Sequence, residues 1–146
     1  MSSQYKQLEL DHQLCFPLYA CSKEIIRQYR PYLEDINLTY TQYIVMMVIW
    51  QEKTINVKEL GKKLFLDSGT LTPVLKSLEN KGYICRNRSL KDERVVLAEL
   101  TKSGEELKEQ AVSIPQKIEQ CINLDKEEAL QLYQILYKIL NGIHDK

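Results

Sequence analysis

The chain has 146 residues, of which 44% are hydrophobic and 27% are charged, and its formal net charge is zero. These values are typical of one globular domain, alone or within a dimer, and they argue against a disordered chain. The longest apolar run, residues 43–50, is too short to span a membrane, and no signal-peptide pattern opens the chain. We therefore expect a soluble cytoplasmic protein with no membrane partner.

Charge and cysteine are distributed unevenly. Residues 55–94 contain nine Lys or Arg and five Asp or Glu, so this segment carries +4 and the remainder carries −4. A basic segment between acidic ends is typical of a nucleic-acid-binding module on an acidic scaffold, although a charged run is also a common solvated face. The four cysteines form no C-x-x-C motif, and we expect reduced thiols. They are Cys15, Cys21, Cys85 and Cys121.

The N-terminal region predicts helices that prolines interrupt. Asp11 is placed to cap a first helix that runs to about Tyr29, and Pro31 should break it and leave a short second piece. Pro17 would be unfavourable inside a regular helix, because it has no N–H and crowds the preceding turn. Either the regular helix begins near Cys15, or its first turn is distorted.

Two capped helices follow in the centre of the chain. Thr39 and Gln42 form a capping box, and the run after them is apolar nearly all round, which predicts a helix central to the core. Asn56, with Glu59 at the third helical position, predicts a short helix that ends near Leu64.

A tight turn separates this helix from the next one, which Asp67 or Ser68 caps. The apolar stripe of that helix consists of Leu71, Val74, Leu75 and Leu78. The periodicity then changes, and residues 83–88 and 94–100 are predicted strands. The charged residues between them predict a hairpin with an exposed tip.

Two longer helices complete the chain. Thr101 is placed to cap a helix that is interrupted at Pro115. Asp125 and Glu128 form a second capping box, and the helix after them should end at Gly142.

This order of elements predicts a mainly α fold with a small β-hairpin wing, that is, a winged helix-turn-helix. We expect a single domain over residues 1–146, with the DNA-binding module at 37–101. Residues 1–36 and 102–146 then form dimerisation helices, because their apolar stripes have little single-chain core to cover them. The expected partners are double-stranded DNA and a second copy of the chain.

In such a module the second short helix enters the major groove with its N-terminal end. The candidate DNA contacts on that helix are Ser68, Thr70, Thr72 and Lys76. On the wing, Arg94 is a candidate for the adjacent minor groove, and the carboxylate of Asp92 can hold it in place. The alternative is that the hydroxyls only cap the helix and that the wing pair is an ordinary surface ion pair.

The segment LDSGTLTPVLKSLENKGYICRNRSLKDERVVLAELT resembles the MarR-type winged-helix regulators. The segment LELDHQLCFPLYACSKEIIRQYRPYLEDINLTYTQY resembles the subgroup that senses organic hydroperoxides through an N-terminal cysteine. Staphylococcal thiol-based global regulators are also similar. The similarity runs over nearly the whole chain, and Pro17 departs from it, because an aliphatic residue is usual at that position.

The resemblance implies that Cys15 is the peroxide-sensing thiol and that two tyrosines of the partner subunit, here Tyr29 and Tyr40, hydrogen-bond it. Cys15 and Tyr29 are separated by ~21 Å along one straight helix, so such a contact requires a second subunit. Phenol donors and a helix N-terminus both favour the reactive thiolate. In two-cysteine members of the subgroup a resolving cysteine lies at a similar distance, which implies Cys121; either it or a small thiol completes the oxidation.

The predicted function is a repressor that binds an inverted-repeat operator as a dimer and is released when organic hydroperoxide oxidises Cys15. One alternative is a MarR-type repressor controlled by a small aromatic ligand in the dimer cleft. A second is a thiol peroxidase, although the sequence shows no convincing Cys–His pair and no cofactor loop. A third is a metal sensor, since His12 and Cys15 lie three positions apart, but two ligands make only half a site. We expect no enzyme activity, no cofactor and no metal.

Overall fold

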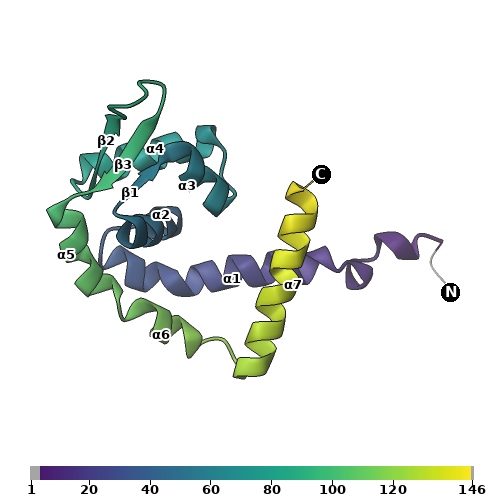
Figure 1. Cartoon of the computed structure of the whole chain (residues 1–146). Helices are drawn as coiled ribbons and strands as arrows, with labels where there is room; N and C mark the ends of the chain where they lie inside the picture. Colours follow the sequence, from purple (N-terminus) through teal and green to yellow (C-terminus); the bar gives the residue numbers. More distant parts are fainter. Residues whose placement is uncertain (1–3, 146) are drawn as a thin grey trace. The chain divides into compact units, whose positions relative to one another are not determined.

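A computed structural model describes residues 4–145 of the chain (Figure 1). The chain is mainly helical with one small antiparallel sheet, which confirms the predicted fold class. It divides into two units, the first ending at Ile114 and the second beginning at Pro115. Within the described residues, no helix is both long enough and apolar enough to cross a membrane.

The N-terminal region confirms the expectation at Pro17, that the regular helix begins near Cys15, and differs from the prediction at Asp11 and Pro31. Two short 3-10 turns, Lys6–Leu8 and Leu10–His12, precede α1, which spans Cys15–Glu34. The helix begins at Cys15 without a side-chain cap, so the predicted capping role of Asp11 was wrong. Pro17 is then the third helical residue, where a missing N–H has no intrahelical partner to lose.

Pro31 does not end α1, contrary to the prediction, and the helix continues to Glu34. The proline lies in the last turns, so the helix loses only the one hydrogen bond that its N–H would have donated to Arg27. The short second piece predicted after Pro31 is therefore the last turn of α1 itself. Asn37 then turns the chain toward the next helix with a positive φ of 56°.

Helix α2 (Tyr40–Glu52) is the centre of the core in the first unit. Its predicted capping box is confirmed: the backbone N–H of Gln42 donates to Thr39 Oγ1 at 3.2 Å, and the backbone N–H of Thr39 donates to Gln42 Oε1 at 3.1 Å. The residues of α2 that are buried are Gln42, Tyr43, Val45, Met46, Ile49 and Trp50. Apolar side chains on every side of the helix explain this central position.

Helices α3 (Val57–Leu64) and α4 (Ser68–Asn80) form the predicted helix-turn-helix. Phe65 makes the turn with a left-handed φ of 56°, and Leu66 N–H donates to Gly61 O at 2.9 Å. A Cβ on Gly61 would lie only 2.8 Å from the carbonyl oxygen of Leu66, so only glycine fits this tight turn. Asp67, rather than Ser68, caps α4 by accepting from the Thr70 amide at 2.7 Å.

The sheet has three strands in the order β1-β3-β2, all antiparallel. Strands β2 (Ile84–Arg88) and β3 (Val96–Leu100) form the predicted hairpin. Strand β1 (Thr54–Asn56) was not predicted, because three residues are too few to show alternation. Asn56 still caps α3, but its side chain accepts from Lys58 N–H, so no capping box forms with Glu59.

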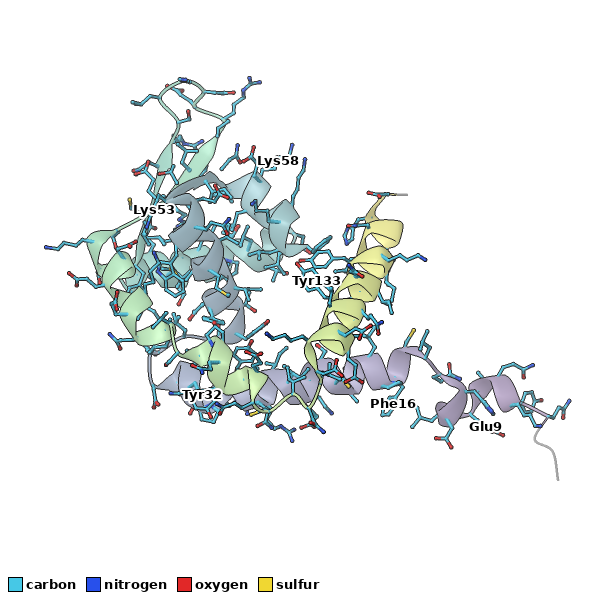
Figure 2. All side chains as sticks on the ribbon, turned by 60° about the horizontal axis from the view of Figure 1, so that its bottom comes forward. Glu9, Phe16, Tyr32, Lys53, Lys58 and Tyr133 are labelled. Atoms are coloured by element: carbon cyan, nitrogen blue, oxygen red, sulfur yellow. The ribbon has the colours of Figure 1, made fainter. Side chains whose placement is uncertain are left out.

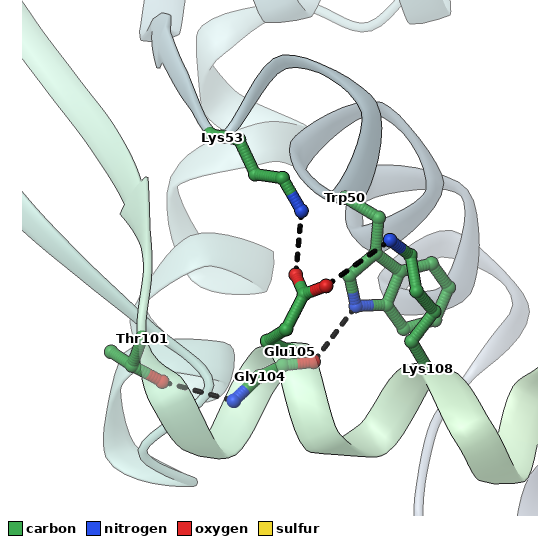
Figure 3. Close-up of polar contacts among 6 residues, drawn as sticks. All are labelled: Trp50, Lys53, Thr101, Gly104, Glu105 and Lys108. Atoms are coloured by element: carbon green, nitrogen blue, oxygen red, sulfur yellow. Dashed lines mark hydrogen bonds and ion pairs between the residues drawn. The ribbon is translucent and has the colours of Figure 1, made fainter.

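Helix α5 (Lys102–Ala111) is fastened to the end of α2, as Figure 3 shows. Trp50 Nε1 donates to the carbonyl oxygen of Gly104 at 2.8 Å, and Lys53 pairs with Glu105 at 2.7 Å. A Cβ on Gly104 would overlap the carbonyl oxygen of Tyr83, so the close approach of α5 to the wing strands requires glycine. The module and the helix that follows it are thus one packed body.

The remaining helices are α6 (Ile114–Glu119) and α7 (Lys126–His144). The predicted interruption lies at residues 112–113, just before Pro115, which is the second residue of α6. The capping box of Asp125 and Glu128 at the start of α7 is confirmed. The helix runs two residues past Gly142, and Figure 2 shows its side chains standing out along its length, with Tyr133 among them.

Candidate functional site

The N-terminal end of α4 presents an exposed row of small hydroxyls. Leu71, Leu75 and Leu78 are buried, so the opposite face of the helix is left to solvent. The backbone N–H of Thr70, with further support from its side chain, lowers the pKa of Asp67 and keeps the cap charged. The candidate DNA contacts on this exposed face are Ser68, Thr70, Thr72 and Lys76.

The wing arginine is held in a fixed position by a carboxylate. Asp92 Oδ1 accepts from the Arg94 backbone N–H at 3.0 Å and from its Nε at 3.1 Å, and Oδ2 accepts from Nη2 at 3.3 Å. The Arg94 side chain is nevertheless 91% exposed. Its guanidinium lowers the pKa of Asp92, so the carboxylate is charged at neutral pH. The pair therefore presents an ordered cation at the edge of the wing.

Helix α4, the expected recognition helix, is also joined to the wing, a feature that the sequence did not reveal. Glu79 on α4 accepts from the Arg86 backbone N–H at 2.9 Å and from its Nη2 at 3.1 Å. These hydrogen bonds, the backbone one foremost, lower the pKa of Glu79. Seven positions separate the two residues on different elements, so helical or strand periodicity gave no signal for this pair.

Cys15 is the first residue of α1 and is exposed. Its neighbours Leu14, Phe16 and Leu18 are exposed as well, and Leu14 reaches 82%. Figure 2 shows Phe16 standing out from this end of the helix. The Cys15 thiol is therefore accessible from solvent at the N-terminal end of a helix.

Tyr29 and Tyr40, both assigned to the sensor by the resemblance, lie side by side. Their ring centroids are 5.0 Å apart, and Tyr43 completes the group at 5.8 Å from Tyr29 and 6.3 Å from Tyr40. Tyr43 is 2% exposed and belongs to the core of its own chain. We call these three residues the tyrosine cluster.

Burial raises the pKa of all three phenols. It is the main cause for Tyr29, with Tyr40 adding to it, and the sole cause for Tyr40. Burial, with the two neighbouring phenols, raises the pKa of Tyr43 to about 12. The hydroxyls are therefore neutral hydrogen-bond donors at any physiological pH. Cys15 cannot reach them within one chain, since α1 is a single continuous helix between Cys15 and Tyr29.

The remaining thiols and the candidate metal ligand lie in other surroundings. Cys121 follows α6, is exposed, and donates to the carbonyl of Lys117 at 3.5 Å. Cys85 lies on β2, with Sγ 3.9 Å from Glu99 Oε2. His12 Nδ1 lies 2.9 Å from the carbonyl oxygen of Lys6, in the preceding 3-10 turn. Over residues 4–145, no group of three metal-ligating side chains comes together.

Known proteins resemble this chain over its whole length. The organic hydroperoxide resistance transcriptional regulator of Bacillus subtilis is 45% identical over 146 residues, which is 100% of this chain and 99% of the relative. A structure of reduced AbfR, a Staphylococcus epidermidis protein, bound to DNA superposes with a TM-score of 0.76 at 31% identity, covering 96% of this chain and 98% of that one. The disulfide form of AbfR gives 0.63 at 32% identity, covering 96% and 95%.

A protein family matches as well. Residues 27–111, more than half of the chain, match the family described as transcriptional regulator SarA/Rot. The match confirms the prediction of a regulator rather than an enzyme, and together with the relatives it confirms the resemblance to thiol-based winged-helix regulators. The chain belongs to the SarA/Rot family of transcriptional regulators.

Proposed function

We propose that this regulator binds an inverted-repeat operator as a homodimer, represses transcription there, and releases the DNA when an organic hydroperoxide oxidises Cys15. The observation that carries the proposal is the pairing of Tyr29 with Tyr40, two neutral phenols that the chain's own sensor thiol cannot reach. Such a pair suits the thiol of a second subunit. The B. subtilis relative bears a hydroperoxide-resistance name, and AbfR has been solved both DNA-bound and as a disulfide.

The dimer is supported by the exposed apolar side chains of α1 and α7. On α7 these are Leu130, Leu132, Tyr133, Ile135, Tyr137, Ile139 and Ile143. So many exposed apolar side chains on one helix indicate a protein–protein interface. In a twofold dimer the two α4 helices then lie about 34 Å apart, one turn of DNA, and the operator is an inverted repeat.

The DNA contacts divide between α4 and the wing. Ser68, Thr70 and Thr72 supply hydroxyls for base edges and phosphates, and Lys76 lies one turn further for the backbone. Arg94, oriented by Asp92, enters the adjacent minor groove. Substitution Arg94→Ala should weaken binding and reduce the magnitude of the slope of log K against log salt by about 0.9, since a cation in the groove displaces about one counterion from the DNA. An unchanged slope would remove Arg94 from the interface.

Oxidation begins with the Cys15 thiolate. Its sulfur attacks one oxygen of the hydroperoxide, the O–O bond breaks, and the alkoxide leaves as an alcohol after taking a proton. The sulfur, oxidised by two electrons, becomes a sulfenic acid. A second thiol, from Cys121 of the partner subunit or a small molecule, then displaces the hydroxyl as water and forms a disulfide. The thiol sites shift, and two recognition helices spaced for one DNA turn no longer fit.

The test is a gel shift on DNA upstream of the protein's own gene, with and without cumene hydroperoxide. Wild-type protein should release DNA after oxidation and bind again after dithiothreitol, whereas Cys15→Ser should stay bound. Cys121→Ser distinguishes the two candidates for the second thiol. If this variant still releases DNA fully and reversibly, a small thiol and not Cys121 forms the disulfide. Release of Cys15→Ser by hydroperoxide would overturn the sensing role, and release by an aromatic ligand alone would favour the ligand-controlled alternative.

A further inference from the structure

The first turn of α2 faces two functional parts of the module. Tyr40 and Tyr43 point to Tyr29 and form the tyrosine cluster with it. Gln42, between them in sequence, points toward α4 instead. At 7% exposure, Gln42 is the one amide or charged side chain that is buried within residues 4–145. A buried amide is retained only where its hydrogen bonds are made.

Every polar atom of the Gln42 side chain has a partner. Its Nε2 donates to Ser77 Oγ on α4 at 3.0 Å. Its Oε1 accepts from Lys81 Nζ, at the C-cap of α4, at 2.9 Å, and from the Thr39 N–H at 3.1 Å. Lys81 Nζ also donates to the carbonyl oxygen of Asn37 at 2.6 Å. One amide therefore connects the α1–α2 turn, the first turn of α2 and the recognition helix.

These contacts are directional, which distinguishes them from the apolar packing around them. Leucines of α4 that pack in the core can slide by fractions of an ångström at little cost, because apolar contact has no preferred angle. Hydrogen bonds weaken steeply with distance and angle, and the bonds to a charged Lys81 are the stronger kind. A rotation of the first turn of α2 must therefore either move α4 or break the bonds at Gln42.

We propose that Gln42 is the positioning residue that couples the tyrosine cluster to the recognition helix. This inference rests on the proposed function, in which oxidation of the partner's Cys15 displaces Tyr40. The displacement turns the first turn of α2, and Gln42 carries the movement to Ser77 and Lys81. The recognition helix then leaves the orientation that fits the operator. Coupling of this kind between two sites typically changes affinity about 5- to 150-fold.

The test compares operator affinity in the reduced and the hydroperoxide-treated states for wild type and Gln42→Leu. Leucine keeps the buried volume but removes both the donor and the acceptor. The variant should oxidise at Cys15 as fast as wild type, measured by loss of free thiol. Its ratio of oxidised to reduced dissociation constants should shrink by about tenfold, because the movement no longer reaches α4. A merely structural role would lower both affinities and leave the ratio unchanged.

Two further variants keep the inference falsifiable. Thr39→Ala is the matched control: it removes the side-chain half of the capping box but leaves both α4 contacts of Gln42, and its ratio should stay at the wild-type value. Ser77→Ala removes one of the two α4 contacts on the helix surface, so it should fold even if Gln42→Leu does not, and its ratio should fall about threefold. If Gln42→Leu and Ser77→Ala both keep the wild-type ratio of dissociation constants, the inference is overturned. If oxidation does not change the operator affinity of the wild-type protein, the proposed function is overturned instead.

Discussion

Helices α2 and α7 begin with the same kind of cap, but α2 is buried and α7 is exposed. Each starts with a capping box, Thr39 with Gln42 in α2 and Asp125 with Glu128 in α7. Six residues of α2 are buried, whereas α7 buries none of its described residues in a single chain. Helix ends are thus decided by neighbours three positions away in sequence, but burial is decided by what the rest of the fold places against the helix.

The difference distinguishes a part of the chain that packs within one subunit from a part whose apolar residues the proposed dimer would cover. The apolar residues of α2 surround the helix, so only a central position can cover them. The apolar residues of α7 remain exposed although they make up much of its sequence. Helical stability in proteins comes mostly from packing of this kind, so a lone α7 would be marginal.

The largest effect is expected when charge is placed on α7. The double substitution Leu132→Lys and Ile135→Lys should raise the dimer dissociation constant by at least about 100-fold, since each large apolar side chain contributes roughly 1.5–3 kcal/mol when covered. Sedimentation velocity across a concentration series measures this constant. Gln134→Lys, a polar site on the same helix, is the control and should remain dimeric. If the double variant stays dimeric at nanomolar concentration, α7 is not the interface.

On α2 the corresponding change acts inside one chain. Met46 is 0% exposed, and Met46→Ala should lower the free energy of unfolding by about 2–5 kcal/mol through lost burial and an unfilled cavity. Its sequence neighbour Met47 is 44% exposed, so Met47→Ala should change the free energy of unfolding by no more than about 0.5 kcal/mol. Urea titration at a fixed protein concentration measures both. Equal losses would mean that α2 is not the centre of the core.

The same division explains which features the sequence could predict. Five helix caps and the Asp92–Arg94 pair were predictable, because each joins residues two or three positions apart. Strand β1 was missed because its pairing partner on β3 lies more than forty positions away, with Ile55 opposite Ala98. Local patterns contain no information about contacts of that range.

The candidate site shows the same limit. Sequence reasoning placed Gln42 in a capping box but could not show its bond to Ser77, which is 35 positions distant. Tyr29 and Tyr40 were assigned to the sensor by family resemblance, whereas no sequence signal placed the third ring, Tyr43, beside them. Pro31 was predicted to break α1 because local rules count the lost hydrogen bond but not the packing that tolerates it.

Removing the two caps compares the helices directly. Thr39→Ala and Asp125→Ala should each cost about 1 kcal/mol, because each leaves one backbone N–H of a first turn without its acceptor. The Thr39→Ala loss should appear in the unfolding of the monomeric double-lysine variant as well as in the dimer. The Asp125→Ala loss should be seen only in the dimer, where α7 is packed. A loss for Asp125→Ala in the monomer would show that α7 is stable without a partner.

The smallest effect concerns the buried phenol of α2. Burial raises the pKa of Tyr43 to about 12, so the folded state keeps this proton at a pH where the unfolded chain has lost it. The resulting stability is fully present below pH 10, the unfolded pKa, and is lost as the pH rises toward 12. At pH 10.5 the wild-type protein should already have lost about 0.8 kcal/mol that Tyr43→Phe cannot lose. Urea titrations at pH 8 and pH 10.5, at constant protein concentration, give the free energy of unfolding of wild type and of Tyr43→Phe. The difference between the two free energies should change between the two pH values. If that difference is the same at both values, Tyr43 is as accessible in solution as the tyrosines of α7, and the contrast between the two helices does not extend to this end of α2.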